Sequence, residues 1–448
     1  MDSCRPRLLL HTLKTSLLIT SQHTRESLSN ERHHEVIIIG GGLAGLSCAV
    51  QLAKSGVDSA VLEATDRVGG RVRSDVIDGF TLDVGFQVLL TAYPSCQELL
   101  DYPALRLRYF DNGALIRQSG RFTQLADPWR NPGKAWATAT NPVASVADKL
   151  RIWRLRSKTC RGSLAELYER PHQTTEQYLR DFGFSERILD QFFRPFIGGV
   201  FLDESLSVSS RMLEFVFRMF SVGGIAVPAD GMAAIPRQLA ERLPRGSVNL
   251  QSSVVRLEGN RVVLANGHSF TGNHIVIATE SNAAARLLER PEIQTSWNET
   301  STLYYSSPQC EQKHKSLILR GDETGPIQTA TIISNVAKEY APLNSSLISV
   351  SLSSTNNRSR DENELHVKAQ LRNWFGDQVR NWELLQTYQI PYGLPVMDID
   401  PVIRSPEVKE RPNTYICGDH CETPSIEGAM DSGMRAATAI LTKQTSIG

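Results

Sequence analysis

The residues best suited to chemistry in this chain are three glycines and one acid that follow the first apolar run. Gly40, Gly42 and Gly45 form a G-x-G-x-x-G pattern, and Glu63 ends the next apolar run. In this pattern the first glycine permits a tight turn, the second lets the backbone approach a pyrophosphate, and the third lets a helix pack closely on a strand. A carboxylate at Glu63 would accept hydrogen bonds from a ribose 2′-hydroxyl and repel a 2′-phosphate. The spacing therefore predicts a dinucleotide site, rather than a tight turn with no ligand.

The elements that must position these residues are a strand, a helix and a second strand. Residues 36–39 are an apolar run typical of a strand that is buried on both faces of a parallel sheet. A helix is expected to follow the glycines and to stop near Gly56, and residues 59–62 form the next expected strand. Phosphates would then lie at the helix N-terminus, where free N–H groups and the helix dipole favour anions.

A second cluster of glycines and cations comes directly after Glu63. Gly69 and Gly70 lie between Arg67 and Arg71. Adjacent glycines allow the backbone to come close to a large anionic ligand, and arginine forms bidentate hydrogen bonds to phosphate. The two arginines could also lie on a solvated loop, but their position right after Glu63 favours a role at the ligand.

Composition limits the class of protein. The chain has 448 residues, enough for two to three domains, and its 48 basic residues balance its 48 acidic residues. That balance gives no support to nucleic-acid binding, which needs a basic excess, and it does not oppose association with a membrane surface or a second copy. The sequence shows no cluster with metal-ligand spacing and no apolar run long enough to span a membrane.

The seven cysteines are scattered, which favours a reducing compartment. Cys417 and Cys421 are too far apart for a C-x-x-C motif, so two unpaired thiols are favoured over a redox pair or a covalent flavin attachment. Residues 1–34 are rich in Ser and Thr and carry five Lys or Arg. They are interpreted as a flexible tail, an organelle transit peptide or the product of an early start codon. The expected location is therefore the cytoplasm, or an organelle stroma or matrix.

Two stretches of the central region stand out from a mostly helical pattern over residues 91–210. The stretch from Lys149 to Arg161 alternates basic and apolar residues. It could form a peripheral membrane contact, although a solvated basic helix face is favoured. Residues 192–201 are dense in aromatics and could line an apolar substrate cavity. By themselves they are better interpreted as a buried helix end that stops at Gly198 and Gly199.

The remaining pattern alternates strands and helices. Runs 248–250, 254–257, 262–264 and 274–277 predict an antiparallel meander that returns to the parallel sheet. Further strands are expected at 317–319 and 347–352, a helix at 362–375, and a proline-punctuated loop at 391–401. A final strand at 415–417 and a helix at 425–441 repeat the opening arrangement. Both glycine-containing loops should lie outside the carboxyl ends of their strands, where open α/β sheets bind ligands.

With these motifs in view, the chain resembles the FAD-dependent flavin amine oxidase superfamily, which includes amine oxidases, protoporphyrinogen oxidases and carotenoid desaturases. The resemblance is carried by residues 35–90, 225–280 and 390–442. It implies an α/β fold with a Rossmann-like FAD-binding domain, in which a parallel sheet carries an antiparallel meander. That domain is expected to comprise residues 35–90, 225–285 and 390–448. An inserted mixed α+β substrate domain is expected to comprise residues 91–224 and 286–389.

The resemblance also implies non-covalently bound FAD and assigns residues to it. The residues placed at the cofactor are Gly40, Gly42, Leu43, Ala44, Gly45, Glu63, Ala64, Arg67, Gly69, Gly70, Arg71, Asp83, Gly85, Phe86, Val254, Ala278, Thr279, Gly418, Asp419, Ile426 and Ala429. Among them, Val254 is expected at the adenine and Asp419 at the pyrophosphate or ribityl groups. The turn at Asp83 is expected to face the isoalloxazine. The helix start from Ile426 to Ala429 is expected to meet the flavin N1/C2=O edge.

The activity implied is transfer of a hydride from an organic substrate to flavin N5. Gln87 is the candidate catalytic residue at the front of the flavin. Amine oxidases of the superfamily carry an aromatic residue where this chain has Ser425, which favours an apolar, isoprenoid- or tetrapyrrole-like substrate over an amine. Two alternatives stay open: an amine oxidase, and a non-catalytic binding protein on the version of the fold found in GDP-dissociation inhibitors.

Overall fold

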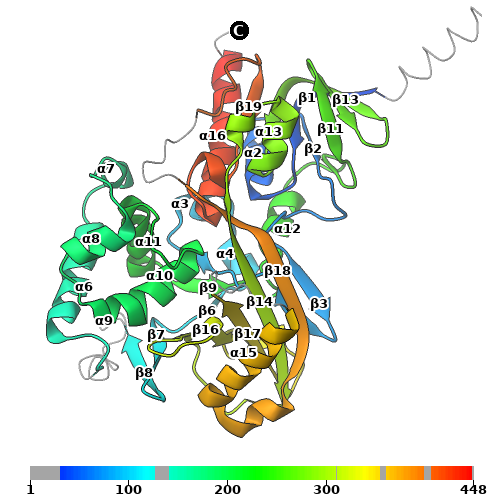
Figure 1. Cartoon of the computed structure of the whole chain (residues 1–448). Coiled ribbons are helices and arrows are strands. Elements are labelled where there is room, and N and C mark those ends of the chain that lie inside the picture. The colour runs from blue at the N-terminus through cyan, green and yellow to red at the C-terminus, as the bar shows by residue number, and fades with distance from the viewer. Residues whose placement is uncertain (1–30, 127–140, 309, 354–359, 398–404, 446–448) are drawn as a thin grey trace, which may run out of the picture.

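The structure is a computed structural model that describes residues 31–126, 141–308, 310–353, 360–397 and 405–445. It contains two seven-stranded sheets joined by long strands, with a group of helices beside the second sheet (Figure 1). The first sheet has the order β10-β2-β1-β13-β12-β11, with β19 also paired to β13. Its strands are β1 (Glu31–Ile39), β2 (Ser59–Leu62), β10 (Val248–Asn249), β11 (Val254–Glu258), β12 (Arg261–Leu264), β13 (Ser269–Ile277) and β19 (Thr414–Ile416).

The first strand is buried on both faces, as its apolar run predicts. Val36 and Ile38 pack into the core shared with helices α2 (Leu43–Lys54) and α16 (Ile426–Thr445). Ile37 and Ile39 pack on the opposite face with helix α13 (Ser281–Leu288). Because neither face meets solvent, a continuous apolar run is favoured over an alternating one. The parallel neighbours β2 and β13 hold β1 at the centre of the sheet.

Two boundaries in this sheet differ from expectation. β1 begins at Glu31, and its first residues pair with Ser269 and its neighbours, so the strand starts before the domain boundary expected at residue 35. Residues 248–249 do not join the meander. They form β10, which pairs in parallel with β2 at the opposite edge of the sheet. A strand of this length has too little pattern to specify its partner. The rest of the predicted meander, β11-β12-β13, is present, and β11 and β12 are joined by a hairpin turn at residues 259–260.

The second sheet has the order β18-β14-β17-β16-β15-β7-β8 and one face covered by helix α15 (Arg360–Phe375). Its strands are β7 (Gly113–Gln118), β8 (Arg121–Ala126), β14 (Trp297–Pro308), β15 (Leu317–Leu319), β16 (Ile327–Ile332), β17 (Ser345–Leu352) and β18 (Glu383–Pro395). The helical pattern expected over 91–210 is therefore wrong at β7 and β8. These strands form a hairpin whose turn residues Ser119 and Gly120 both have positive φ, as two-residue hairpin turns require.

The proline-punctuated loop expected at 391–401 is wrong over its first part. β18 continues through Pro391 to Pro395, past the domain boundary expected at 390. Proline is tolerated there because β18 is an edge strand, and its pairing with β14 shifts register between the partners of Asn298 and Thr300. Residues 398–401 of the expected loop, and residues 1–30 of the expected tail, lie outside the described residues.

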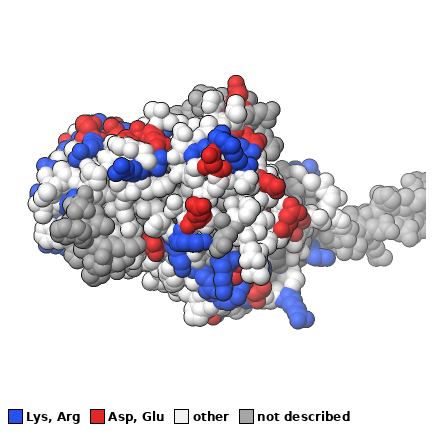
Figure 2. Space-filling model, turned by 90° about the horizontal axis from the view of Figure 1, so that it is seen from below, with Lys and Arg blue, Asp and Glu red and all other residues white. Residues whose placement is uncertain are grey.

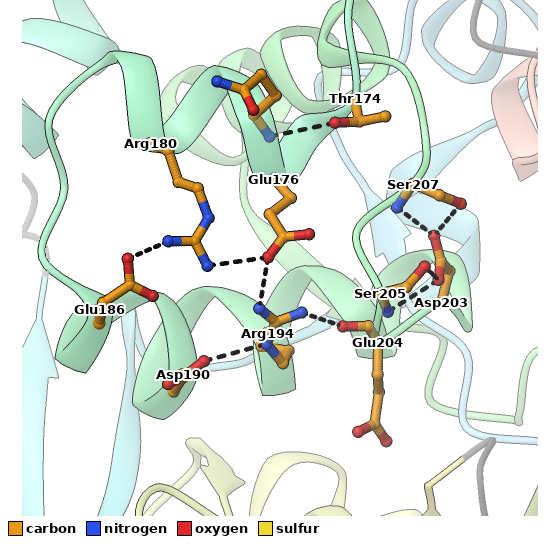
Figure 3. A network of polar contacts seen from close by, with 11 residues as sticks. Thr174, Glu176, Arg180, Glu186, Asp190, Arg194, Asp203, Glu204, Ser205 and Ser207 are labelled. Atoms are coloured by element: carbon orange, nitrogen blue, oxygen red, sulfur yellow. Dashed lines mark hydrogen bonds and ion pairs between the residues drawn. The ribbon is translucent and has the colours of Figure 1, made fainter.

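The helices beside the second sheet are held together by a network of ion pairs (Figure 3). Arg194 donates to Glu176 on helix α8 (Thr175–Asp181) at 3.0 Å and to Asp190 at 3.2 Å. The helices of this group are α6 (Val146–Thr159), α7 (Leu164–Tyr168), α8, α9 (Glu186–Ile188), α10 (Arg194–Phe201) and α11 (Ser210–Val222). The remaining elements are α3 (Pro94–Leu99), α4 (Tyr102–Leu105), α12 (Ala234–Glu241), α14 (Ile333–Val336), β3 (Ser74–Ile77), β4 (Phe80–Asp83), β5 (Leu89–Leu90), β6 (Arg108–Tyr109) and β9 (Ile225–Val227).

Helix α10 does not stop at its glycine pair as expected. It continues through Gly198 and Gly199 to Phe201, and Leu202 then adopts a left-handed conformation with φ of 55°. The carboxylate of Asp203 accepts hydrogen bonds from the backbone and hydroxyl groups of Ser205 and Ser207, which fixes the turn after the helix (Figure 3). This side-chain turn, rather than the glycines, ends the helix.

Candidate functional site

The turn between β1 and α2 shows why its three glycines differ. A methyl group on Gly45 would lie 2.0 Å from the Gly40 carbonyl oxygen, and one on Gly40 would lie 2.7 Å from the Ala278 carbonyl oxygen. Both positions therefore need glycine for the fold itself. A methyl group on Gly42 would meet no protein atom within 4 Å, so this glycine leaves open space at the start of α2. Helix α2 also has no side-chain cap, with Gly42 as its N-cap residue. The predicted phosphate position is therefore free of protein atoms next to an uncapped helix N-terminus.

Glu63 is fixed in place at the end of β2. Its Oε2 accepts the Gly41 N–H at 2.7 Å, and its Oε1 accepts the Thr65 N–H at 2.9 Å and the Thr65 hydroxyl at 2.8 Å. A carboxylate has about four lone-pair sites, so three protein donors leave capacity for a ligand hydroxyl. Ser252 N–H also donates to the Glu63 carbonyl, which brings the start of β11, and thus Val254, next to this acid. The roles of Thr65 and Ser252 were not predicted from the sequence.

The two glycines of the second cluster lie directly against the first. Gly69 N–H donates to the Gly41 carbonyl at 2.8 Å, and a methyl group on Gly70 would lie 3.5 Å from the Gly42 Cα atom. The two arginines of the cluster diverge, however. Arg67 forms an ion pair with Asp75 at 2.7 Å and is 44% exposed, so it supports the β3 hairpin locally. Of the two arginines predicted to contact phosphate, only Arg71 reaches residues from the C-terminal part of the described chain.

Arg71 joins three distant segments at one point. Its guanidinium donates to the Asp419 carboxylate at 2.6 Å and to the Gly393 carbonyl at 3.0 Å, and it lies 5.1 Å from the ring centroid of Trp297. Burial alone would lower the pKa of Arg71, but the neighbouring Asp419 carboxylate outweighs burial and raises it. Asp419 is 4% exposed and Arg71 34%. The arrangement keeps a cation fixed beside the predicted pyrophosphate position. Trp297 also contributes to holding this cation, a role that the sequence did not predict.

Asp83 lies at the junction of the two sheets rather than on an open surface. Its carboxylate accepts hydrogen bonds from the Ser74 hydroxyl at 2.6 Å, the Met232 N–H at 2.8 Å and the Tyr340 hydroxyl at 2.9 Å. The Tyr304 hydroxyl donates to the Asp83 carbonyl at 2.9 Å. The side chain expected to face the isoalloxazine is thus occupied by protein donors. Its structural effect is to hold the β3–β4 hairpin against the second sheet.

Replacing Asp83 by asparagine is expected to change how stability depends on pH. Burial raises the pKa of Asp83 from 3.8 to about 6, despite three hydrogen bonds that favour the ionised form. An acid whose pKa is raised on folding stabilises the fold most below its unfolded pKa, and that contribution is lost as pH rises through the folded value. Between pH 4 and 6 the wild type should lose up to about 3 kcal/mol of unfolding free energy relative to D83N.

Urea unfolding of both proteins across this pH range measures the difference. The variant Y340F is the matched control, since it keeps the carboxylate and removes one hydrogen bond to its ionised form, so its loss should extend to higher pH. Parallel pH profiles for the wild type and D83N would contradict the assignment of this pH dependence to Asp83.

The last segment of the chain completes the site beside Ala278 and Thr279 at the end of β13. Gly418 has φ of 149°, and its N–H donates to the Ser432 hydroxyl at 2.9 Å. At the start of α16, the Ser425 hydroxyl accepts the Gly428 N–H and the Ser425 carbonyl accepts the Ala429 N–H. The Ala429 N–H is therefore hydrogen-bonded within the helix, and the contact of this helix start with the flavin edge stays a prediction. In the described part of the chain the Ile426 N–H has no hydrogen bond and stays available.

Gln87 lies beside the Arg71 backbone. Its Nε2 donates to the Arg71 carbonyl at 3.0 Å, whereas its Oε1 is buried and has no hydrogen-bond partner among the described residues. Buried amide oxygens are normally paired, so this acceptor is suited to a ligand group. Nearby, Phe86 packs edge-on against Phe110, with ring centroids 6.2 Å apart. Gly85 has φ of 92°, a backbone conformation that favours glycine, and a methyl group there would meet the flexible end of the Ile390 side chain at 2.7 Å.

Comparison with known proteins identifies the family. A family model described as flavin containing amine oxidoreductase matches residues 43–441, which is most of the chain. The chain belongs to this family. Its members are flavin-dependent oxidoreductases, and the alternative of a non-catalytic binding protein finds no support.

Relatives of this chain act on different substrates, as their names state. Protoporphyrinogen oxidase 2 of Arabidopsis thaliana is 25% identical over 280 residues, covering 54% of this chain and 53% of that protein. A 15-cis-phytoene desaturase of an Oncidium hybrid cultivar is 26% identical over 326 residues, covering 67% and 55%. The chain thus spans about half the length of these curated relatives. A putrescine oxidase bound to putrescine matches with a TM-score of 0.71 and 17% identity over 92% of this chain and 99% of that one, which shows the shared fold.

The residues of this site fit a flavin nucleotide. Open space at Gly42 beside an uncapped helix suits a pyrophosphate, the spare capacity of Glu63 suits a ribose hydroxyl, and Arg71 supplies a fixed cation. Among the described residues, no group of His, Cys, Asp and Glu side chains is arranged to hold a metal ion. None of the described helices combines the length and apolar character needed to cross a bilayer.

Proposed function

We propose that this protein binds FAD non-covalently and transfers a hydride to it from an apolar organic substrate of the isoprenoid or tetrapyrrole class. The observation that carries the cofactor assignment is the open space at Gly42, which we call the cradle. No protein atom occupies this space, and a side chain at position 42 would fill it. Cys417 is fully buried in the core, and its pKa is raised well above the usual value by burial. A protonated, inaccessible thiol supports non-covalent binding over a thioether link to the cofactor.

The preference for an apolar substrate rests on a row of aromatic side chains. Neighbouring ring centroids lie 4.9–5.6 Å apart in the order Phe182, Phe184, Phe193, Phe192, Phe196 and Phe220. Phe192 and Phe196 pack toward the face of the second sheet formed by Ile116 and Leu319, opposite the face covered by α15. Phe184 and Phe193 are buried in the core, so the partly buried rings of the row are the ones available to contact a flat or extended apolar molecule.

One residue at the start of α16 bears on the amine alternative. The position that is aromatic in amine oxidases is Ser425 here, and its hydroxyl is used as the cap of α16. This supports an apolar substrate over an amine, and it agrees with the tetrapyrrole- and carotenoid-directed names of two curated relatives. Bound FAD would supply the hydride-accepting chemistry. The chain would bind and orient it, and the unpaired Gln87 Oε1 would hold a polar group at the reacting face.

A two-step experiment tests the proposal. The purified chain is first reconstituted with FAD, and its bound flavin is measured after gel filtration and after acid precipitation, which releases only non-covalent flavin. The loaded protein is then mixed anaerobically with protoporphyrinogen, a polyene isoprenoid or putrescine, and loss of the flavin's visible absorbance is followed. Bleaching by either apolar substrate and not by putrescine is expected. Rapid bleaching by putrescine alone would favour the amine oxidase, and absence of bound flavin would reject the cofactor assignment.

A further inference from the structure

Helix α6 carries an apolar stripe that points away from the protein. Val146, Leu150 and Trp153 follow the i, i+4, i+7 spacing of one helix face and are 74%, 62% and 51% exposed. The opposite face of the same helix is buried through Asp148 and Leu155. A helix of a globular protein normally turns its apolar face inward, whereas the outward face of α6 is also apolar along this stripe.

Cations gather beside this stripe in a surface hollow of about 560 Å³. The hollow is lined by two aromatic rings and four cations: Trp153, Phe182, Arg154, Lys158, Arg161 and Arg170. The Arg154 guanidinium lies 5.6 Å from the centroid of the Phe182 ring. The hollow thus combines aromatic surface with a dense group of positive charges at the edge of the apolar stripe.

The positive charge of the hollow is mostly uncompensated. Lys158 and Arg170 share the single carboxylate of Glu214, at 2.8 and 2.7 Å. Within the described residues, Arg154 and Arg161 have no carboxylate within ion-pair distance. Four cations beside one acid leave a local excess of positive charge, although the whole chain has no net charge. Figure 2 shows basic and acidic side chains interspersed on the face of the molecule that is seen from below.

We infer that the outer face of α6 docks onto an anionic lipid bilayer. Exposed Leu and Trp side chains beside cations are the composition of interfacial helices, in which the apolar residues enter the headgroup boundary and the cations bind lipid phosphates. The apolar stripe favours a bilayer over a nucleic acid, and the uncompensated cations favour anionic over neutral lipid. This inference does not depend on the identity of the substrate. Docking would place the aromatic row, whose outer member Phe182 lines the hollow, beside the membrane.

The test is vesicle co-sedimentation of the full chain. Vesicles consist of phosphatidylcholine alone or mixed with phosphatidylglycerol. The wild type should bind the mixed vesicles, and high salt should weaken that binding because it screens the charges. The variants L150E and R154E/R161E should each lower the partition coefficient by about tenfold or more. L365E is the matched control, since Leu365 is 71% exposed on α15, and it should bind like the wild type.

A second readout uses Trp153 directly. Quenching of tryptophan fluorescence by brominated lipid should occur in the wild type and fall in W153F, although five other tryptophans remain. Circular dichroism checks that each variant folds. Absence of binding to mixed vesicles, equal binding to neutral vesicles, or equal losses in L365E would overturn the inference. Stabilisation by inorganic phosphate without vesicle binding would also overturn it, because it would identify a small-anion site instead.

Discussion

Replacing Gly42 by alanine should leave the protein folded and remove most of its affinity for FAD. Gly42 has φ of −75° and ψ of −179°, which alanine adopts without strain, and the added methyl group meets no protein atom within 4 Å. The methyl group would instead occupy the space proposed for the pyrophosphate. Loss of two charge-assisted hydrogen bonds of about 1.5 kcal/mol each corresponds to about a hundredfold weaker binding. Flavin content after reconstitution and a thermal unfolding scan measure the two effects separately.

Two further glycines serve as controls for this variant. In G45A the methyl group would lie 2.0 Å from the Gly40 carbonyl oxygen, so this variant should lose stability as well as flavin. In G199A the nearest atom is the Thr329 methyl group at 3.6 Å, an ordinary contact, so flavin binding should be retained. If G42A bound FAD as tightly as the wild type, the cradle at Gly42 would not hold the pyrophosphate.

Removing Arg71 should cost more stability than removing its partner. In R71A the Asp419 carboxylate, 4% exposed, is left buried without its cation, which typically costs about 3–5 kcal/mol. In D419A the guanidinium that remains is 34% exposed and is still hydrogen-bonded to the Gly393 carbonyl, so the cost should be smaller. The double variant should recover part of the loss seen in R71A. Free energies of unfolding for the four proteins form a double-mutant cycle that measures the coupling.

The control for the Arg71 series lies four positions earlier. Arg67 also forms an ion pair, with Asp75, but both partners are substantially exposed, at 44% and 29%. Exposed pairs contribute about 0–1 kcal/mol, so R67A should be close to the wild type in stability. Equal losses of unfolding free energy in R67A and R71A would mean that the burial of Asp419 does not make the Arg71 ion pair stronger than the exposed Arg67 pair. R71A should also bind flavin poorly, whereas R67A should bind flavin like the wild type.

The parts of the fold that the sequence predicts are those with local signals. The β1–α2–β2 unit follows from the apolar run before Gly40 and the spacing of the glycines, because each feature is decided within a few residues. The β7–β8 hairpin was missed although Ser119-Gly120 is a hairpin turn signal, because the surrounding segments read as helical. The strand character of Pro391 depends on its place at a sheet edge, which no local pattern reports.

The residues of the candidate site also divide into those that a local pattern predicts and those that it does not. Gly40, Gly42, Gly45 and Glu63 could be assigned because the backbone geometry they require is local. Pairing of Arg71 with Asp419 joins residues 348 positions apart, and a single sequence carries no record of that contact. Asp83 was assigned to the flavin from its motif, but its hydrogen-bond partners include Tyr304 on strand β14 and Tyr340 on a short 3-10 helix, both more than 200 residues away. Side-chain environment is set by tertiary packing, which the motif alone does not describe.

The discontinuous first sheet has a consequence for how the protein is made. β1 and β2 are synthesised more than 200 residues before their neighbour β13, and α16, which packs on α2, follows later still. Helices α2 and α16 cross so closely that a methyl group on Gly433 would lie 2.1 Å from the Ala44 carbonyl oxygen. Until α16 has left the ribosome, the apolar faces of the β1–α2–β2 unit lack their partners and need protection from aggregation. The nascent chain therefore completes its cradle only once α16 has emerged, and a ligand that bridges the two distant segments would then stabilise the fold by mass action.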